Sequence, residues 1–105
     1  MPQFTVYRNA NRKSKATTPY LLDIQSDLLT DLSTRVVIPV VTLDALGIKP
    51  LTRLMPKIDI EGETCVVLAP QLAGVSAKEL GQPVGNLSHL RAEILAALDL
   101  LFTGF

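Results

Sequence analysis

This sequence of 105 residues has no net charge, because ten basic residues balance ten acidic ones. A protein whose main task is to hold DNA or RNA needs a positive field, because contacts to phosphate supply most of the non-specific affinity. Attachment to an anionic membrane surface needs the same field. The balance therefore argues against a dedicated nucleic-acid binder and against a protein that works on a membrane.

Residues that commonly carry catalysis or bind metals are scarce as well. Cys65 is the only cysteine and His89 the only histidine. A zinc site or a Cys–His pair would therefore require the fold to bring these two distant residues together. Cys65 has no partner for an intrachain disulfide, and its apolar neighbours predict a small buried side chain. Several carboxylates are expected to be solvated or to form turns, with no shared metal or acid–base role: Asp23, Asp27, Asp31, Asp44 and Asp59. The sequence predicts no catalytic residue, no metal and no cofactor.

Targeting segments, long apolar runs and clustered glycines are also missing. The six glycines are scattered, so neither a phosphate-binding loop nor a dinucleotide fingerprint is present. The chain opens with a strand-like pattern in place of a charged leader, which predicts a cytoplasmic protein. The apolar stretch at the end is too short for a bilayer, which needs about 20 such residues, and Asp99 interrupts it.

Short β-type segments fill the first two-thirds of the chain. Alternating or β-branched apolar residues predict five strands, at residues 3–7, 20–25, 35–41, 57–60 and 64–68. Pro39 cannot donate to a ladder, so it predicts an edge or a bulge in the third strand. Glu61, Gly62 and Glu63 predict a hairpin link between the last two strands. Such strands suggest a small barrel or sandwich.

The remaining segments complete one predicted domain over residues 1–105. Residues 43–50 predict a single helical turn ended by Gly47 and Pro50. Residues 75–80 fit either a last strand or a short turn, and residues 81–85 are expected to break the pattern before the final helix. The fold class is therefore α+β, mainly β, with its main helix at the end of the chain.

The final helix is predicted over residues 88–105, with Ser88 as N-cap and Gly104 as C-terminal stop. Its apolar residues recur at steps of three and four and define one face, formed by Leu87, Leu90, Ile94, Leu98 and Leu101. Leu95 and Phe102 widen that face. Asp99 lies near the helix end, where a negative charge is disfavoured, and an apolar pattern that runs this close to the terminus predicts a surface for a partner.

The order and spacing of several motifs resemble the CcdB toxins of bacterial toxin–antitoxin modules. The motifs are Gln25-Ser26-Asp27 followed by Leu28 and Leu29, the strand Arg35-Val36-Val37-Ile38-Pro39, and the terminus Phe102-Thr103-Gly104-Phe105. The resemblance spans the whole chain. It implies an SH3-like small barrel of antiparallel strands with a C-terminal α-helix, assembled as a symmetric homodimer that poisons DNA gyrase and catalyses nothing.

The resemblance also implies partners. The helix ends would bind the gyrase A subunit and trap its DNA-cleavage complex, and a CcdA-like antitoxin would neutralise the toxin. The toxin would reach operator DNA only within the antitoxin complex, as a co-repressor of its own operon. By matching position the gyrase contacts are Leu28, Leu29, Asp99, Phe102, Thr103, Gly104 and Phe105.

The tip differs from the best-known plasmid-borne member at three positions. Thr103 stands in place of a tryptophan, which removes an indole that could stack on a gyrase arginine and contribute about 0.5–2 kcal/mol. Asp99 replaces an asparagine, and Phe105 replaces an isoleucine. We hypothesise that Asp99, the last helical carbonyls and the terminal carboxylate form an anionic cluster that attracts a gyrase arginine.

The resemblance also implies an antitoxin surface that includes the basic stretch of residues 8–15, the segment 42–49 and part of the tip. A disordered acidic antitoxin tail would suit the four clustered cations of the basic stretch. The candidate residues of this surface are Arg8, Arg12, Lys13, Lys15, Asp44, Leu46 and Lys49. The basic stretch is expected to form a mobile loop. It is either an ordinary solvated loop or a contact for an acidic partner or a phosphate.

Two other functions stay open at this point. A messenger RNA endoribonuclease on the same fold, as in MazF and Kid, would use Arg35 and the basic stretch, although a clear acid–base pair is missing. An inactive homologue would bind antitoxin without toxicity.

Overall fold

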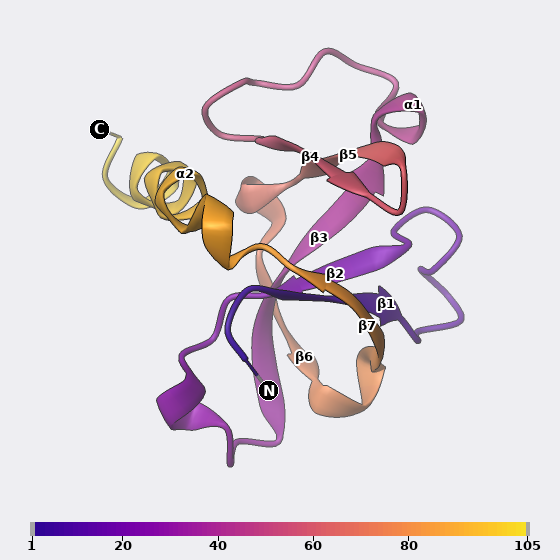
Figure 1. Ribbon diagram of the computed structural model, residues 1–105, viewed down its shortest axis with the longest axis vertical. Helices are drawn as coiled ribbons and strands as arrows, with labels where there is room; N and C mark the ends of the chain where they lie inside the picture. Colours follow the sequence, from indigo (N-terminus) through magenta and orange to yellow (C-terminus); the bar gives the residue numbers. More distant parts are fainter. Residues whose placement is uncertain (1, 105) are drawn as a thin grey trace.

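The computed structural model describes residues 2–104 and contains a seven-stranded sheet in which every strand pair is antiparallel. Along the sheet the order is β4-β5-β3-β2-β1-β7, and β6 pairs with β3. The strands are β1 (Thr5–Asn9), β2 (Tyr20–Asp23), β3 (Thr34–Thr42), β4 (Lys57–Ile60), β5 (Glu63–Val67), β6 (Ala73–Ser76) and β7 (Leu80–Asn86). The sheet curls into a half-barrel, and the C-terminal helix projects from its side (Figure 1). The predicted α+β, mainly β fold with a terminal helix is confirmed.

Strand β3 lies at the centre of the sheet and not at its edge. It pairs with β2 on one side, while on the other side Thr34 to Val37 pair with β6 and Val40 to Thr42 pair with β5. Pro39 lies between the residues that pair with β6 and those that pair with β5. Its missing N–H therefore interrupts neither of these two ladders. The predicted edge or bulge was therefore wrong, because the register with β2 runs through Pro39 without a shift, and the proline marks a change of partner within one strand.

Strand β7 occupies residues for which a break in the pattern was predicted, and that prediction was wrong. The strand pairs with β1 at the edge of the sheet, with register shifts near Tyr7, and places Pro83 opposite Tyr7. An edge with irregular register tolerates both proline and glycine. A Cβ at Gly81 would lie 2.8 Å from the Arg8 carbonyl oxygen, so this glycine permits a close approach of the two strands.

Replacing Gly81 with alanine is therefore expected to destabilise the protein by about 1–3 kcal/mol, the range for a local steric clash. Gly85→Ala in the same strand is the matched control, because a Cβ there meets nothing within 4 Å. Urea unfolding followed by circular dichroism measures both free energies. Equal stability of the two variants would contradict the close-approach argument.

Two α-helices are present among residues 2–104. Helix α1 (Leu43–Leu46) is the predicted single turn, capped by the Thr42 hydroxyl and ended by Gly47 at φ +71°. Helix α2 (Arg91–Thr103) ends at Gly104, as predicted, but begins later than predicted. Ser88 is not its N-cap, because residues Ser88–Leu90 form the 3₁₀ turn η4, and the Asn86 side chain accepts the Ser88 N–H at 2.8 Å.

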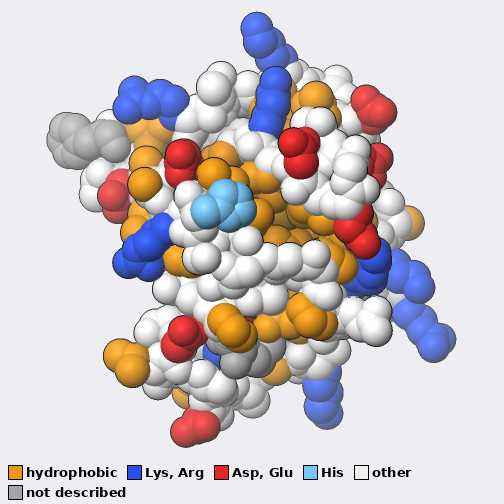
Figure 2. Space-filling model, viewed as in Figure 1, with side chains coloured by type: hydrophobic (Ala, Val, Ile, Leu, Met, Phe, Trp, Pro, Cys, Tyr) orange, Lys and Arg blue, Asp and Glu red, His pale blue; other side chains and the backbone are white. Residues whose placement is uncertain are grey.

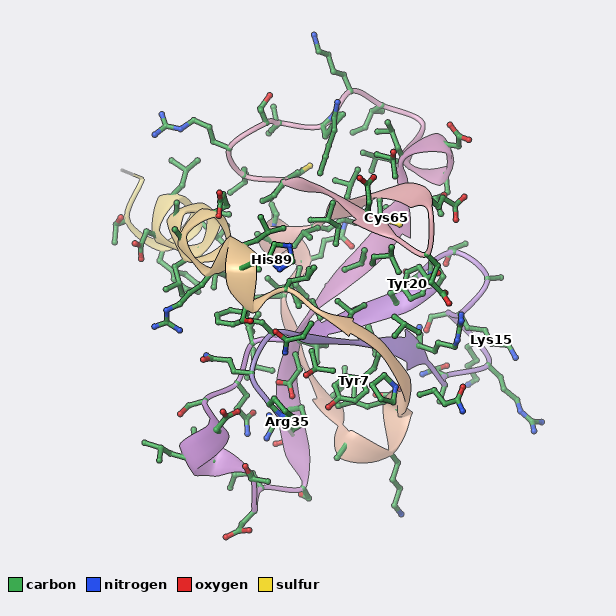
Figure 3. All side chains as sticks on the ribbon, in the orientation of Figure 1. Tyr7, Lys15, Tyr20, Arg35, Cys65 and His89 are labelled. Carbon is green, nitrogen blue, oxygen red and sulfur yellow. The ribbon has the colours of Figure 1, made fainter. Side chains whose placement is uncertain are left out.

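The core lies between the curled sheet and the inner face of α2. Ile94, Ala97 and Leu98 of α2 pack with Ile58, Ile60 and other strand residues in one apolar cluster. Leu87 is buried, and Leu90 and Leu101 are half-buried, so the predicted helix face does pack on the core. Cys65 is fully buried in β5 (Figure 3), and burial raises the pKa of its thiol. It is the small buried side chain that the sequence predicted.

The β4–β5 link is a tight hairpin turn, as predicted. Its two central residues, Glu61 and Gly62, have φ of +52° and +82°, the pattern of a two-residue turn that matches the twist of a hairpin. Glu61 also accepts hydrogen bonds from Arg8 at 2.8 and 2.9 Å and from the Tyr20 hydroxyl at 3.2 Å. The left-handed backbone at Glu61 is thus held by contacts to β1 and β2. Burial and the Glu61 hydrogen bond raise the pKa of Tyr20.

Candidate functional site

The end of α2 presents an exposed apolar and acidic tip. Phe102 is 67% exposed, and Asp99, Thr103 and Gly104 are also exposed, whereas Leu100 and Leu101 are half-buried. Gly104 at φ +78° donates its N–H to the Leu100 carbonyl at 3.0 Å and closes the helix. The tip is therefore a capped helix end with a solvated aromatic ring. Phe105, the last predicted contact, lies outside the described residues.

Thr103 has a local role at this tip. Its hydroxyl donates to the Asp99 carbonyl at 2.7 Å, one turn back along the helix, a bond that threonine side chains in helices commonly form. The side chain is thereby directed to its own helix. Phe102 is consequently the only aromatic side chain that the described part of the tip offers to a partner. Asp99 forms no ion pair with any residue in the 2–104 range.

A second exposed apolar surface surrounds η1 (Asp27–Leu29), which follows β2. Leu28 is 93% exposed and Leu29 49%, and neighbouring Leu32 and Val36 are 52% and 36% exposed. Ser26 caps the turn by accepting the Leu28 N–H at 3.2 Å. Four apolar side chains within nine residues of chain form a patch of the kind that marks a contact site. We call Leu28, Leu29, Leu32 and Val36 the η1 patch.

Buried polar residues hold the η1 patch in place from below. The Gln25 side chain donates to the Leu29 carbonyl at 3.0 Å and accepts the Val36 N–H at 3.0 Å. Its backbone N–H donates to Asp23 at 3.0 Å. One side chain thus ties the turn, strand β3 and the end of β2 together, and fixes the position of Leu29.

Asp23 in turn forms a buried ion pair with Arg35. The Arg35 guanidinium donates through Nη2 at 2.6 Å and Nε at 3.2 Å, and both side chains are fully buried. The Arg35 Nη1 has no hydrogen-bond partner among the described residues. Tyr7 lies in the same half of the molecule (Figure 3). The pKa of Tyr7 is raised mainly by burial and to a smaller extent by the charge of Asp23. The expectation that Asp23 is solvated was wrong.

The burial of Arg35 argues against a role for this residue in the ribonuclease alternative. A fully buried guanidinium that is bonded to Asp23 has no access to an RNA phosphate. His89 is exposed on η4, whereas Cys65 is buried in β5, so these two side chains form no pair. Among residues 2–104 no group of three His, Cys, Asp or Glu side chains is arranged to hold a metal ion.

The basic stretch forms the connection between β1 and β2. Asn9 bonds to the Ser14 hydroxyl and the Thr18 carbonyl, both at 2.9 Å, and Asn11 accepts the Lys13 N–H at 2.8 Å. Arg12, Lys13 and Lys15 are exposed on this framework, and Figure 3 shows Lys15 at its outer edge. Arg8 differs from them because it belongs to β1 and pairs with Glu61 at 2.8 Å.

The other predicted antitoxin residues lie on and after α1. Asp44 and Lys49 are exposed, and Leu46 is half-buried against a small apolar cluster with Val41 and Val66. This segment, the β1–β2 connection, the η1 patch and the helix tip occupy separate places around the sheet (Figure 1). The structure therefore does not gather the predicted residues into one site. Sequence reasoning assigned no site role to Leu32, Val36 or Gln25, although Gln25 and Val36 stand within the motifs that carry the resemblance.

These features define a small half-barrel protein whose candidate sites are exposed contact surfaces. Residues 3–104 match the family model described as CcdB protein. Because the match spans nearly the whole sequence, the chain belongs to the CcdB family. This family comprises toxins of toxin–antitoxin modules that generally poison DNA gyrase and are not enzymes themselves. No helix within residues 2–104 is long and apolar enough to cross a membrane.

Proposed function

We propose that this protein is a toxin that binds the DNA gyrase A subunit and traps the gyrase–DNA cleavage complex. The observation that carries the proposal is the tip of α2, where a capped helix leaves Phe102 67% exposed. A large solvated aromatic ring beside an acidic residue is a typical anchor for a protein partner. The contacts would be Asp99, Phe102, Thr103, Gly104 and Phe105, with Leu28 and Leu29 from the η1 patch.

A homodimer would supply two such tips. In one protomer the η1 patch and the tip lie apart (Figure 1), so a twofold assembly is the simplest way to present several of these surfaces to one symmetric target. We propose a cytoplasmic homodimer, since gyrase acts on DNA in that compartment. A CcdA-like antitoxin would neutralise the dimer and, in complex with it, repress the shared operon.

The proposal is tested by expressing the chain and a version truncated after Leu101 in a gyrase-sensitive host. Growth and plasmid linearisation are measured, and circular dichroism checks that the truncated protein is folded. Gyrase-dependent cleavage by the full chain and none by the truncated chain is the expected result. Toxicity with messenger RNA decay and intact plasmid would favour the ribonuclease, and a harmless full chain would favour an inactive homologue.

Asp99 gives the proposed gyrase contact an electrostatic component. Asp99→Asn removes the exposed carboxylate near the helix end and is expected to weaken gyrase binding by up to about fivefold, the range for one exposed ion pair. Binding of the variant should also fall less steeply with salt. Titrating the gyrase A subunit at several ionic strengths measures both effects. Identical affinity and salt slope would remove Asp99 from the interface.

The proposed antitoxin surface has its own test. Arg12 and Lys13 are exposed and have no carboxylate partner within residues 2–104. The double variant Arg12→Glu/Lys13→Glu is expected to slow association with an acidic antitoxin about tenfold at low salt, because charge steers the encounter. Stopped-flow association kinetics measure this rate, and plasmid linearisation should be unchanged. An unaltered rate would place the antitoxin elsewhere.

A further inference from the structure

The residues that precede β1 lie between the η1 turn and the start of helix α2 (Figure 1). On the side of η1, the Gln3 backbone N–H donates to the Asp27 carboxylate at 2.6 Å, and the Gln3 side-chain Nε2 donates to the Ile24 carbonyl at 3.0 Å. On the side of α2, the Arg91 guanidinium donates to Gln3 Oε1 at 3.4 Å and lies 5.7 Å from the centre of the Phe4 ring. This ring distance permits a cation–π attraction. Gln3 therefore contacts both elements that carry residues of the proposed gyrase contact.

The side-chain amide of Gln3 has one orientation that suits both of its neighbours. A guanidinium can only donate hydrogen bonds, and a backbone carbonyl can only accept them. The amide oxygen therefore faces Arg91, while the amide nitrogen faces Ile24. The Gln3 carbonyl accepts the Asn86 side chain at 3.1 Å, and Asn86 accepts the Ser88 N–H at 2.8 Å in the turn that leads into α2. A half-buried side chain that is bonded at both ends restricts movement of η1 relative to α2.

The backbone of Phe4 is what places Gln3 in this position. Phe4 has a φ of +69°, a left-handed conformation that is rare and strained for a bulky residue. Its ring is 2% exposed in the main core, its N–H donates to the Asp23 carbonyl at 2.7 Å, and its carbonyl accepts the Leu87 N–H at 2.8 Å. Strain of this kind persists where the surrounding structure holds it, and it is common at functional sites.

We propose that Gln3 is a positioning residue that couples the η1 patch to helix α2. Figure 2 shows hydrophobic side chains exposed at the lower left of the view, over the η1 turn. Gln3 would hold Leu28 and Leu29 of this patch in a fixed position relative to α2, whose end carries Phe102. Contact residues that are fixed before binding lose less freedom when they meet a partner. The role in binding rests on the proposed gyrase function, whereas the coupling within the protein does not.

Amide chemical shifts test the coupling without gyrase. Arg91→Met removes the contact on the side of α2 and is expected to shift the amide signals of residues 26–29. The same substitution in a Gln3→Ala chain should shift these signals much less, because the connecting side chain is gone. Shifts of equal size in both chains would reveal an effect of Arg91 that bypasses Gln3, and this result, like the absence of shifts in both, would overturn the proposal.

Affinity for the gyrase A subunit tests the role in binding. Gln3→Ala is expected to weaken this affinity about fivefold, within the range for a residue in a network that links two sites. Gln82→Ala is the matched control, because Gln82 is an exposed glutamine of β7 outside the proposed gyrase and antitoxin contacts, and it should leave the affinity unchanged. Circular dichroism verifies that both variants are folded. Equal affinities of the two variants would contradict the role of Gln3.

A double-mutant cycle separates positioning from a general loss of stability. In a Leu28→Ala/Leu29→Ala chain, Gln3→Ala should weaken gyrase binding less than twofold further, because a positioning residue acts through the side chains that it holds. The full fivefold loss in that chain would show that Gln3 does not act through the η1 patch. If the unsubstituted chain binds no gyrase, the proposed function fails, and the amide shifts decide the coupling on their own.

Discussion

Replacing Arg35 with methionine is expected to lower the free energy of unfolding by about 3–5 kcal/mol, which is the cost of leaving one buried charge without its partner. Arg35 and Asp23 are both fully buried and are joined at 2.6 Å. Methionine fills a similar volume, so the lost charge, and not a cavity, dominates the effect. Denaturant unfolding followed by circular dichroism measures the change.

Arg8→Met is the matched control for this effect. Arg8 forms the other ion pair of the described residues, with Glu61 at 2.8 Å, but the two side chains are 48% and 46% exposed. An exposed pair contributes about 0.2–1 kcal/mol. The double variant Asp23→Leu/Arg35→Met should recover part of the loss, because it leaves no buried charge. A loss at Arg35 no larger than at Arg8 would contradict the structural role of the buried pair.

Replacing Phe102 with alanine is expected to weaken binding to the gyrase A subunit by about 2 kcal/mol or more, which is roughly thirtyfold. Phe102 is 67% exposed, and the Thr103 side chain is bonded back to the Asp99 carbonyl. The ring is thus the largest apolar group that the described tip can bury in a partner. Isothermal titration calorimetry measures the affinity, and plasmid linearisation should fall in parallel.

Ile48→Ala is the matched control, because Ile48 is similarly exposed, at 65%, but lies after α1 and is not part of the proposed gyrase contact. It should leave gyrase binding and plasmid linearisation unchanged. Both side chains are largely solvated, so neither substitution should alter stability by more than about 0.5 kcal/mol. Unchanged affinity of Phe102→Ala would move the gyrase contact away from the tip.

The parts of the fold that sequence predicted are those in which local pattern and tertiary packing agree. The β4–β5 hairpin and the core-facing residues of α2 follow from periodicity and turn chemistry. Strand β7 was missed because Gly81, Pro83 and Gly85 disfavour strands, and the pairing with β1 that offsets this preference is a contact distant in sequence. The position of Pro39 was predicted wrongly for the same reason. A proline fits in this strand because the partner of β3 changes there from β6 to β5, which local sequence does not reveal.

The candidate site was predictable to a similar extent. An apolar residue near the end of an amphipathic helix indicates an exposed anchor, and Phe102 is exposed as expected. The burial of Asp23 and Arg35 could not be predicted, because each lies 12 residues from the other and each alone resembles a surface charge. One signal was present: Arg35 opens a run of β-branched residues that fills a central strand. A charge within such a run favours a buried pair.

The pairing of β1 with β7 has a consequence for synthesis of the chain. Thr5 and Asn86 are neighbours in the sheet although 81 residues separate them. While a ribosome is still making the protein, β1 has only β2 beside it and its other edge stays bare. The sheet is complete only after Leu80–Asn86 has left the exit tunnel, and the α2 tip emerges later still. The pairing of β1 is therefore complete only after residues 80–86 have been made.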